Sequence, residues 1–161
     1  MTRTAGWLGA RETAPFTFRW NAWALAPFLL AAMATAVPYF FRHSFTAIAL
    51  LLQTGFQLAC HQRPERSFEL FGGIVAVCSR WLGIYLGAAV GLLLRTSRQL
   101  ALQLMLSAVV VSGLDSAAEA LGLHGNWTCL RFVLGFVLGT TAGMLVSSST
   151  RYHETSRFST L

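Results

Sequence analysis

The sequence contains no lysine and carries little charge of either sign. Only 11% of its 161 residues are charged, against roughly 25% in a soluble domain, and just six are acidic. Hydrophobic residues make up 55% of the chain, which is more apolar surface than a soluble core of this size can bury. These shortages exclude a nucleic-acid-binding domain despite a net charge of +6, and they exclude a disordered chain. An integral membrane protein remains, with the lipid bilayer as its first predicted partner and nucleic acid excluded.

Cysteine is scarce as well, and the common catalytic motifs are missing. Three cysteines in a multi-span chain do not form a dense disulfide framework. The chain contains no nucleophile elbow, phosphate-binding P-loop, H-E-x-x-H zinc motif or dinucleotide-binding glycine pattern. A familiar soluble catalytic centre is therefore not predicted. Whether the protein is an enzyme stays open, and no cofactor is assigned.

Long apolar runs predict an all-α, polytopic bundle with four transmembrane helices. A helix needs about 20 apolar residues to cross a bilayer, and such runs cover residues 21–41, 73–94, 99–121 and 130–147. The first run has no charged residue, whereas the others contain Arg80, then Asp115 and Glu119, then Arg131. The chain then divides into a polar N-terminal tail, one membrane-embedded helical domain and a polar C-terminal tail, over residues 1–20, 21–148 and 149–161.

A further uncharged run, at about residues 43–60, is too short for a firm assignment. It predicts either a re-entrant or interfacial helix or a fifth span. Gln53, Gln57 and His61 recur every four residues, so we expect them on one face of that helix.

The distribution of arginine favours four spans. If the run at 43–60 does not cross, seven arginines lie on the cytoplasmic side and three outside; if it crosses, the division is five to five. We therefore predict a multi-pass protein of the plasma membrane with both termini cytoplasmic. With either count, two spans separate the loop after His61 from the loop around His124, so both loops lie on the same membrane face.

Glycines recur at a four-residue step in two of the predicted helices. In lipid such stripes let helix backbones approach closely, because no hydrophobic force drives helices together there. The sequence therefore predicts that the segments at 73–94 and 130–147 pack through their stripes, which are Gly83, Gly87, Gly91 and Gly135, Gly139, Gly143.

Four charged side chains fall near one end of these spans: Arg80, Asp115, Glu119 and Arg131. A charge inside the bilayer costs roughly 2.5–3.5 kcal/mol, so two acids and two arginines are expected to pair. We expect Asp115 to pair with Arg131, with Arg80 as the alternative. The pairs either fix the bundle or belong to a polar binding site, and the sequence leaves both readings open.

Cysteine and histidine also gather in this region. Cys60, His61 and Cys78 carry thiol and imidazole groups, the usual ligands of zinc, copper or haem iron. The set lacks a fourth ligand, so the three remain weak candidates and no metal is assigned. A Cys60–Cys78 disulfide and simple packing are the other interpretations of the two thiols.

A family resemblance rests on these same residues. Cys60-His61-Gln62-x-Pro64-Glu65-Arg66-Ser67-Phe68, then Cys78-x-Arg80-x-x-Gly83-Ile84-Tyr85-x-Gly87, resembles the prokaryotic membrane proteins called domain of unknown function 2085. Gly113-Leu114-Asp115 and the stretch from Leu130 resemble its C-terminal half, so the likeness covers roughly residues 45–145. It implies a small helical membrane bundle and no assigned activity. Trp81 stands where many relatives have a second cysteine, which weakens a family-wide metal site in this chain.

These observations define a candidate polar cluster for binding at one membrane face: Cys60, His61, Gln62, Glu65, Arg66, Ser67, Cys78, Arg80, Tyr85, Asp115 and Arg131. The leading hypothesis is binding or translocation of a small polar or anionic solute. The alternatives are an accessory or structural membrane subunit, and a membrane-embedded redox or lipid-head-group enzyme using His61 with Cys60 or Cys78. A transporter of this size without internal repeats is expected to need a homo-oligomer or another membrane subunit.

Overall fold

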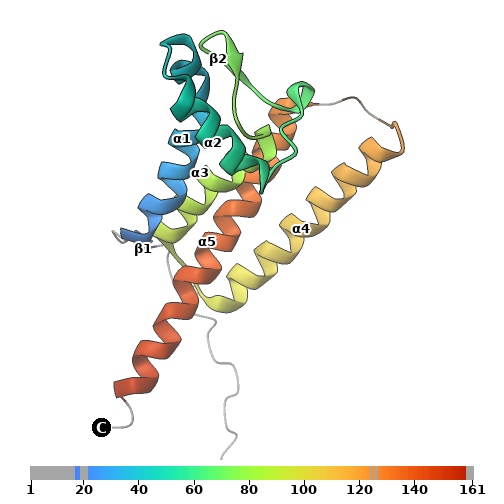
Figure 1. Cartoon of the computed structure of the whole chain (residues 1–161). Helices are drawn as coiled ribbons and strands as arrows, with labels where there is room; N and C mark the ends of the chain where they lie inside the picture. Colours follow the sequence, from blue (N-terminus) through green and yellow to red (C-terminus); the bar gives the residue numbers. More distant parts are fainter. Residues whose placement is uncertain (1–16, 19–21, 124, 126, 159–161) are drawn as a thin grey trace, which may run out of the picture.

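The computed structural model describes residues 17–18, 22–123, 125 and 127–158, with side-chain surroundings for those between 22 and 148 (Figure 1). The fold is mostly helical, as predicted, with two short strand pairs added. The helical elements are η1 (Ala22–Ala24), α1 (Leu25–Arg42), α2 (Thr46–Gln57), η2 (Pro64–Arg66), α3 (Ser79–Leu93), α4 (Arg98–Ala120) and α5 (Thr128–Phe158). β1 (Thr17–Phe18) pairs antiparallel with β4 (Leu94–Arg95), and β2 (Glu69–Leu70) pairs antiparallel with β3 (Gly73–Ile74).

Three helical segments in the described chain are long and apolar enough to cross a membrane. They are Ala22–Arg42, Arg98–Ala120 and Thr128–Ser148. The predicted span at 73–94 is wrong at its start, because Gly73–Ile74 pairs with Glu69–Leu70 in a hairpin and the helix begins only at Ser79. α3, with 15 residues, and α2, with 12, fall short of that length.

The tails fit the predicted domains only in part. Residues 149–158, predicted as a polar tail, continue helix α5. Most of the predicted tail at 1–20 lies outside the described residues, and Thr17–Phe18 within it form strand β1.

The long helices run in alternating directions. α1 and α4 run toward the end of the molecule drawn at the top of Figure 1, whereas α3 and α5 run away from it. α2 begins where α1 ends and packs back along it. Because α2 ends at Gln57 and a turn follows at Leu58–Ala59, His61 does not share a helix face with Gln53 and Gln57, which corrects that prediction.

A non-helical segment inside the bundle connects the hairpin to α3. Val75, Ala76 and Val77 are buried, and the N–H of Ala76 donates to the carbonyl of Ala34 over 3.2 Å. Ala34 lies in the middle of the first candidate span, so this non-helical backbone lies beside the middle of that span. Non-helical backbone is tolerated there only when protein or a water-filled cavity surrounds it. Here α1 provides that protein surface.

The most extensive helix contact joins α3 to α5, and glycine makes it possible. A methyl group added at any stripe glycine would overlap a backbone carbonyl of the facing helix: Gly87 meets Phe136, for example, and Gly139 meets Ile84. The two backbones therefore touch directly. We call this contact the glycine seam, formed by Gly83, Gly87, Gly91, Gly135, Gly139 and Gly143.

Candidate functional site

A cavity of about 350 Å³ lies where three parts of the chain meet: the loop after α2, the first turn of α3 and the first turn of α5. We call it the arginine pocket. Its lining residues are Cys60, His61, Gln62, Arg63, Arg66, Cys78, Arg80, Trp81 and Arg131. The loop is held in place by the side-chain amide of Gln62, whose Nε2 donates to the carbonyl of Gln53 on α2 over 2.7 Å.

Arg80 is anchored from α4 by two contacts. Its Nη2 lies 2.6 Å from Oδ2 of Asp115, and its Nη1 donates to Oγ of Ser116 over 2.7 Å. The Asp115 side chain is only 7% exposed. Asp115 thus pairs with Arg80, the alternative partner, rather than with Arg131 as first expected.

Glu119 joins two further arginines. Its Oε1 lies 3.0 Å from Nη2 of Arg66 in the loop, and its Oε2 pairs with Arg131 on α5. One carboxylate therefore holds the loop, α4 and α5 together. The contact also places the loop after His61 beside the end of α4. His124 itself lies outside the described residues.

The arginine pocket has an excess of positive charge. Four arginines line it, and no carboxylate is among its described lining residues. Asp115 and Glu119 lie behind the guanidinium groups and offset only part of that charge. Arg80 Nε is also buried without a hydrogen-bond partner in the described part of the chain. The site is therefore suited to an anion that can accept hydrogen bonds from guanidinium groups.

The two cysteines of the pocket are neighbours and are free thiols. The backbone N–H of Cys78 donates to Sγ of Cys60 over 3.2 Å. Among the described residues, no three His, Cys, Asp or Glu side chains are grouped to hold a metal.

Several residues of the predicted cluster lie outside the pocket lining. Glu65 is exposed, and Ser67 Oγ donates to the backbone carbonyl of Arg63 over 3.1 Å. Tyr85 packs between Phe56 and Trp81, with ring centroids 6.5 and 5.7 Å away.

Sequence reasoning missed three participants in the site: Arg63, Trp81 and Ser116. Arg63 occupies the variable position inside the Cys60–Phe68 motif, and Trp81 is the position that departs from the family pattern. Ser116 neighbours Asp115 and gave no signal of its own.

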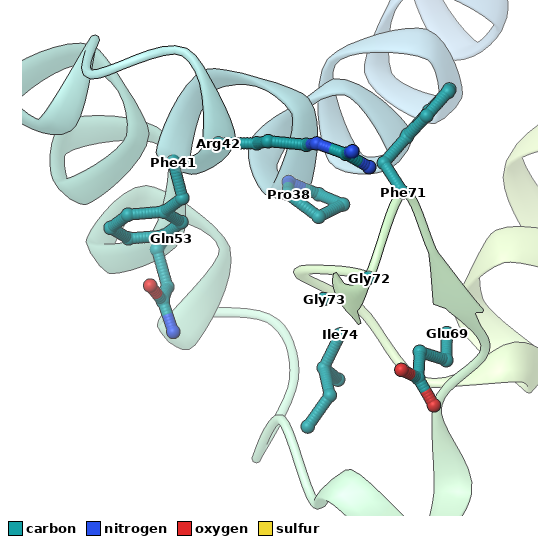
Figure 2. A pocket seen from close by; sticks show the side chains of 9 residues that line it. All are labelled: Pro38, Phe41, Arg42, Gln53, Glu69, Phe71, Gly72, Gly73 and Ile74. Carbon is teal, nitrogen blue, oxygen red and sulfur yellow. The ribbon is translucent and has the colours of Figure 1, made fainter.

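A second cavity, of about 820 Å³, lies at the end of α1, between α2 and the β2–β3 hairpin (Figure 2). The predicted cluster includes none of its lining residues. No motif marked them, because they come from three separate segments that only the fold brings together.

Comparison with known proteins covers the region of the arginine pocket. Residues 60–145, more than half of the chain, match the family described as "Predicted membrane protein (DUF2085)". The chain belongs to this family. The matched region contains every residue that lines the arginine pocket and leaves α1 and α2 outside. The family and the three candidate spans together identify a membrane protein.

Two archaeal proteins that carry the name uncharacterized protein are similar to this DUF2085 chain. One, from Methanocaldococcus jannaschii, is 33% identical over 101 residues, which cover 58% of this chain and 65% of the relative. Another, from Methanothermobacter thermautotrophicus, is 33% identical over 97 residues, covering 56% of this chain and 86% of the relative. The chain thus spans less than two thirds of the length of the first relative. No solved structure matches it.

Proposed function

We propose that this DUF2085 protein is a four-pass membrane protein that binds a small anionic solute in the arginine pocket. The observation that carries the proposal is the charge of the pocket, with four arginines in the lining and the two acids set behind them. A volume of about 350 Å³ is at the low end for small-molecule sites, which favours an inorganic oxyanion or a small carboxylate.

The first turn of α3 adds to this positive field. Cys78, Arg80 and Trp81 line the pocket, so the N-terminal end of the helix faces it. The aligned peptide dipoles of a helix place partial positive charge at that end, where backbone N–H groups lack helical partners. Broken or short helices that begin inside a membrane present such ends to anionic substrates in transporters. The same arrangement here supports an anion over a cation.

The strand pairing supports four crossings. β1 pairs with β4, so residues 17–18 and 94–95 lie on the same side of the membrane, and the chain between them crosses an even number of times. Crossing by α1 and α3 without α2 satisfies that condition, whereas three crossings do not. α3 is about 22 Å long at 1.5 Å per residue, and the buried non-helical segment at Val75–Val77 lengthens its path. We therefore propose that α2 is re-entrant and that both termini are cytoplasmic.

Cysteine labelling in intact cells tests this topology. Arg63→Cys should react with a membrane-impermeant maleimide from outside, because Arg63 is exposed at the end opposite the predicted cytoplasmic loops. Arg98→Cys, at the start of α4, should react only after the membrane is permeabilised. The unmodified chain gives the background from its own three cysteines. Labelling of both variants from outside would contradict four crossings.

Anion binding is tested on the full chain purified in detergent. Isothermal titration with phosphate, sulfate and acetate should give saturable binding of at least one anion. Arg63→Gln should weaken that binding roughly fivefold, because an exposed charge contact contributes about 1 kcal/mol. Arg98→Gln removes the same charge far from the pocket and should leave binding unchanged. Absence of saturable binding, or equal loss in both variants, would contradict the proposal.

Translocation of the bound anion would require a partner. Four crossings enclose too little space for a path, so we propose a homo-oligomer or a second membrane subunit as the transporting form. The available surface for such a contact is α4, which packs against α5 and leaves Leu106, Val110 and Leu114 exposed.

A further inference from the structure

The larger cavity lies at the membrane boundary and has a mixed lining. We call it the hairpin pocket. The end of α1 contributes Pro38, Phe41 and Arg42, and α2 contributes Gln53. The hairpin contributes Glu69, Phe71, Gly72, Gly73 and Ile74. Figure 2 shows Arg42 reaching across Pro38 toward Phe71, whereas Glu69 lies farther along the hairpin.

The lining holds one cation and one acid that do not pair with each other. Arg42 and Glu69 are both exposed, and among the described residues neither side chain takes part in an ion pair. Separated charges of opposite sign match a ligand that carries both charges itself. A simple anion or a simple cation would meet one unfavourable charge in this pocket.

The depth of the pocket points to a lipid. Arg42 is the last residue of the first candidate span, so its guanidinium group lies at the level of the lipid head groups. Aromatic rings gather at this end of α1, where Tyr39 contacts His43 and Phe71 at centroid distances of 4.1 and 5.8 Å. The apolar side chains of Phe41, Phe71 and Ile74 are 40%, 55% and 46% exposed. An amphiphile entering from the bilayer could place its polar head group beside Arg42 and its apolar chains beside Phe41, Phe71 and Ile74.

The turn at the tip of the hairpin has a strained backbone, and this backbone positions the Phe71 side chain at the pocket. Phe71 has φ 53° and Gly72 has φ 76°, so the two central residues of the turn are both left-handed. Such a turn favours Asn or Gly at its first central position, and a bulky residue there costs roughly 1–2 kcal/mol. Strain of this kind is concentrated at ligand sites. Here it places an aromatic ring beside Tyr39 and over the pocket.

We propose that the hairpin pocket binds one phospholipid whose head group carries a phosphate and a primary ammonium, as in phosphatidylethanolamine. Arg42 binds the phosphate and Glu69 accepts hydrogen bonds from the ammonium. The apolar rim of Phe41, Phe71 and Ile74 contacts the upper acyl chains. The site is separate from the arginine pocket and does not depend on the anion proposed there.

Native mass spectrometry of the full chain tests this site. The protein is purified in mild detergent and incubated with equal amounts of dioleoyl phosphatidylethanolamine, phosphatidylcholine and phosphatidylglycerol. We expect one phosphatidylethanolamine to be retained preferentially. Phosphatidylcholine lacks N–H donors for Glu69, and phosphatidylglycerol lacks the positive charge.

Variants assign the preference to the two charges. Arg42→Gln and Glu69→Gln should each reduce retention of phosphatidylethanolamine roughly tenfold, as expected for loss of one charge-assisted contact. Arg42→Lys should keep part of it, and Glu65→Gln, an exposed acid in the loop outside the pocket, should keep all of it. Size-exclusion profiles identify any variant that fails to fold, and Arg42→Lys then decides the test. Equal retention of the three lipids, or a preference for phosphatidylglycerol that Arg42→Gln leaves intact, would overturn the proposal.

Discussion

The glycine seam and the α2–hairpin region, residues 46–78, are built on opposite principles. The seam brings two helix backbones into contact and uses almost no side chain to do so. The α2–hairpin region consists of a short helix, a loop and a hairpin with two-residue strands, and its polar contacts with the other helices include the Ala76 N–H to the Ala34 carbonyl and Arg66 to Glu119. Both cavities are lined largely by the α2–hairpin region. Rigidity and chemistry are therefore divided between two regions of one small molecule.

The seam nevertheless determines where the chemistry lies. Arg80 precedes Gly83 by one helical turn, and Arg131 precedes Gly135 by one turn. Gly135 itself lies against the backbone of Arg80. The closest contact between α3 and α5 therefore fixes the separation of two guanidinium groups, and the loop supplies the rest of the arginine pocket around them.

The largest expected effect comes from a substitution in the seam. Gly87→Leu places a branched side chain against the backbone of Phe136, which cannot move without displacing α5. Overpacking of a core costs about 1–3 kcal/mol when neighbouring side chains can shift, and here only backbone is available to shift. We expect loss of the folded bundle, measured as aggregation on size exclusion and loss of a thermal transition in detergent.

Gly113→Leu provides the matched control. A methyl group at Gly113 on α4 meets no atom within 4 Å, so this variant should behave like the unmodified chain. Comparable stability of the two leucine variants would show that the seam is looser than its geometry indicates.

A smaller loss is expected where the seam meets the charged cluster. Asp115→Asn leaves Arg80 without its anionic partner, and breaking a buried ion pair costs roughly 3–5 kcal/mol. Because Arg80 is 24% exposed, we expect the lower part of that range. The double variant Arg80→Gln/Asp115→Asn should recover part of the loss in thermal stability. Strictly additive losses would mean that the two side chains do not stabilise each other.

The smallest effect is expected at the tip of the hairpin. Phe71→Asn replaces a strained aromatic residue with one that tolerates a left-handed backbone, which should stabilise the fold by up to about 1 kcal/mol. Loss of the contact with Tyr39 opposes that gain. A melting temperature equal to or slightly above that of the unmodified chain is expected. A large destabilisation would show that the hairpin, like the glycine seam, is needed for the stability of the fold.

The sequence was most informative where residues repeat at the spacing of a helical turn. The four-residue glycine steps identified the two helices that touch, because only the helical repeat is needed to align Gly83, Gly87 and Gly91. Long apolar runs identified α1, α4 and α5. The charged residues near one end of these helices also form ion pairs, as predicted, because an unpaired charge in lipid is costly.

Prediction failed where local contacts override composition. The apolar run at 73–94 contains no signal that Gly73 and Ile74 pair with Glu69 and Leu70, so the predicted helix begins six residues before the observed one. The partner of Asp115 depended on the rotation of α3 about its axis, which spacing along α4 does not determine. The hairpin pocket joins three segments with no shared motif and was invisible before the fold was known.

The direct backbone contact between α3 and α5 has a consequence for the continuity of the chain. The residues that join these helices in space are separated in sequence by the whole of α4 and the turn at Gly122. A peptide bond in that turn contributes little to an attachment made along several helical turns of the seam. Two coexpressed fragments, divided after Gly122, would therefore reassemble in the membrane into the intact fold. Helix α5, which Gly87→Leu is expected to displace, would thus keep its place when the chain is divided before it.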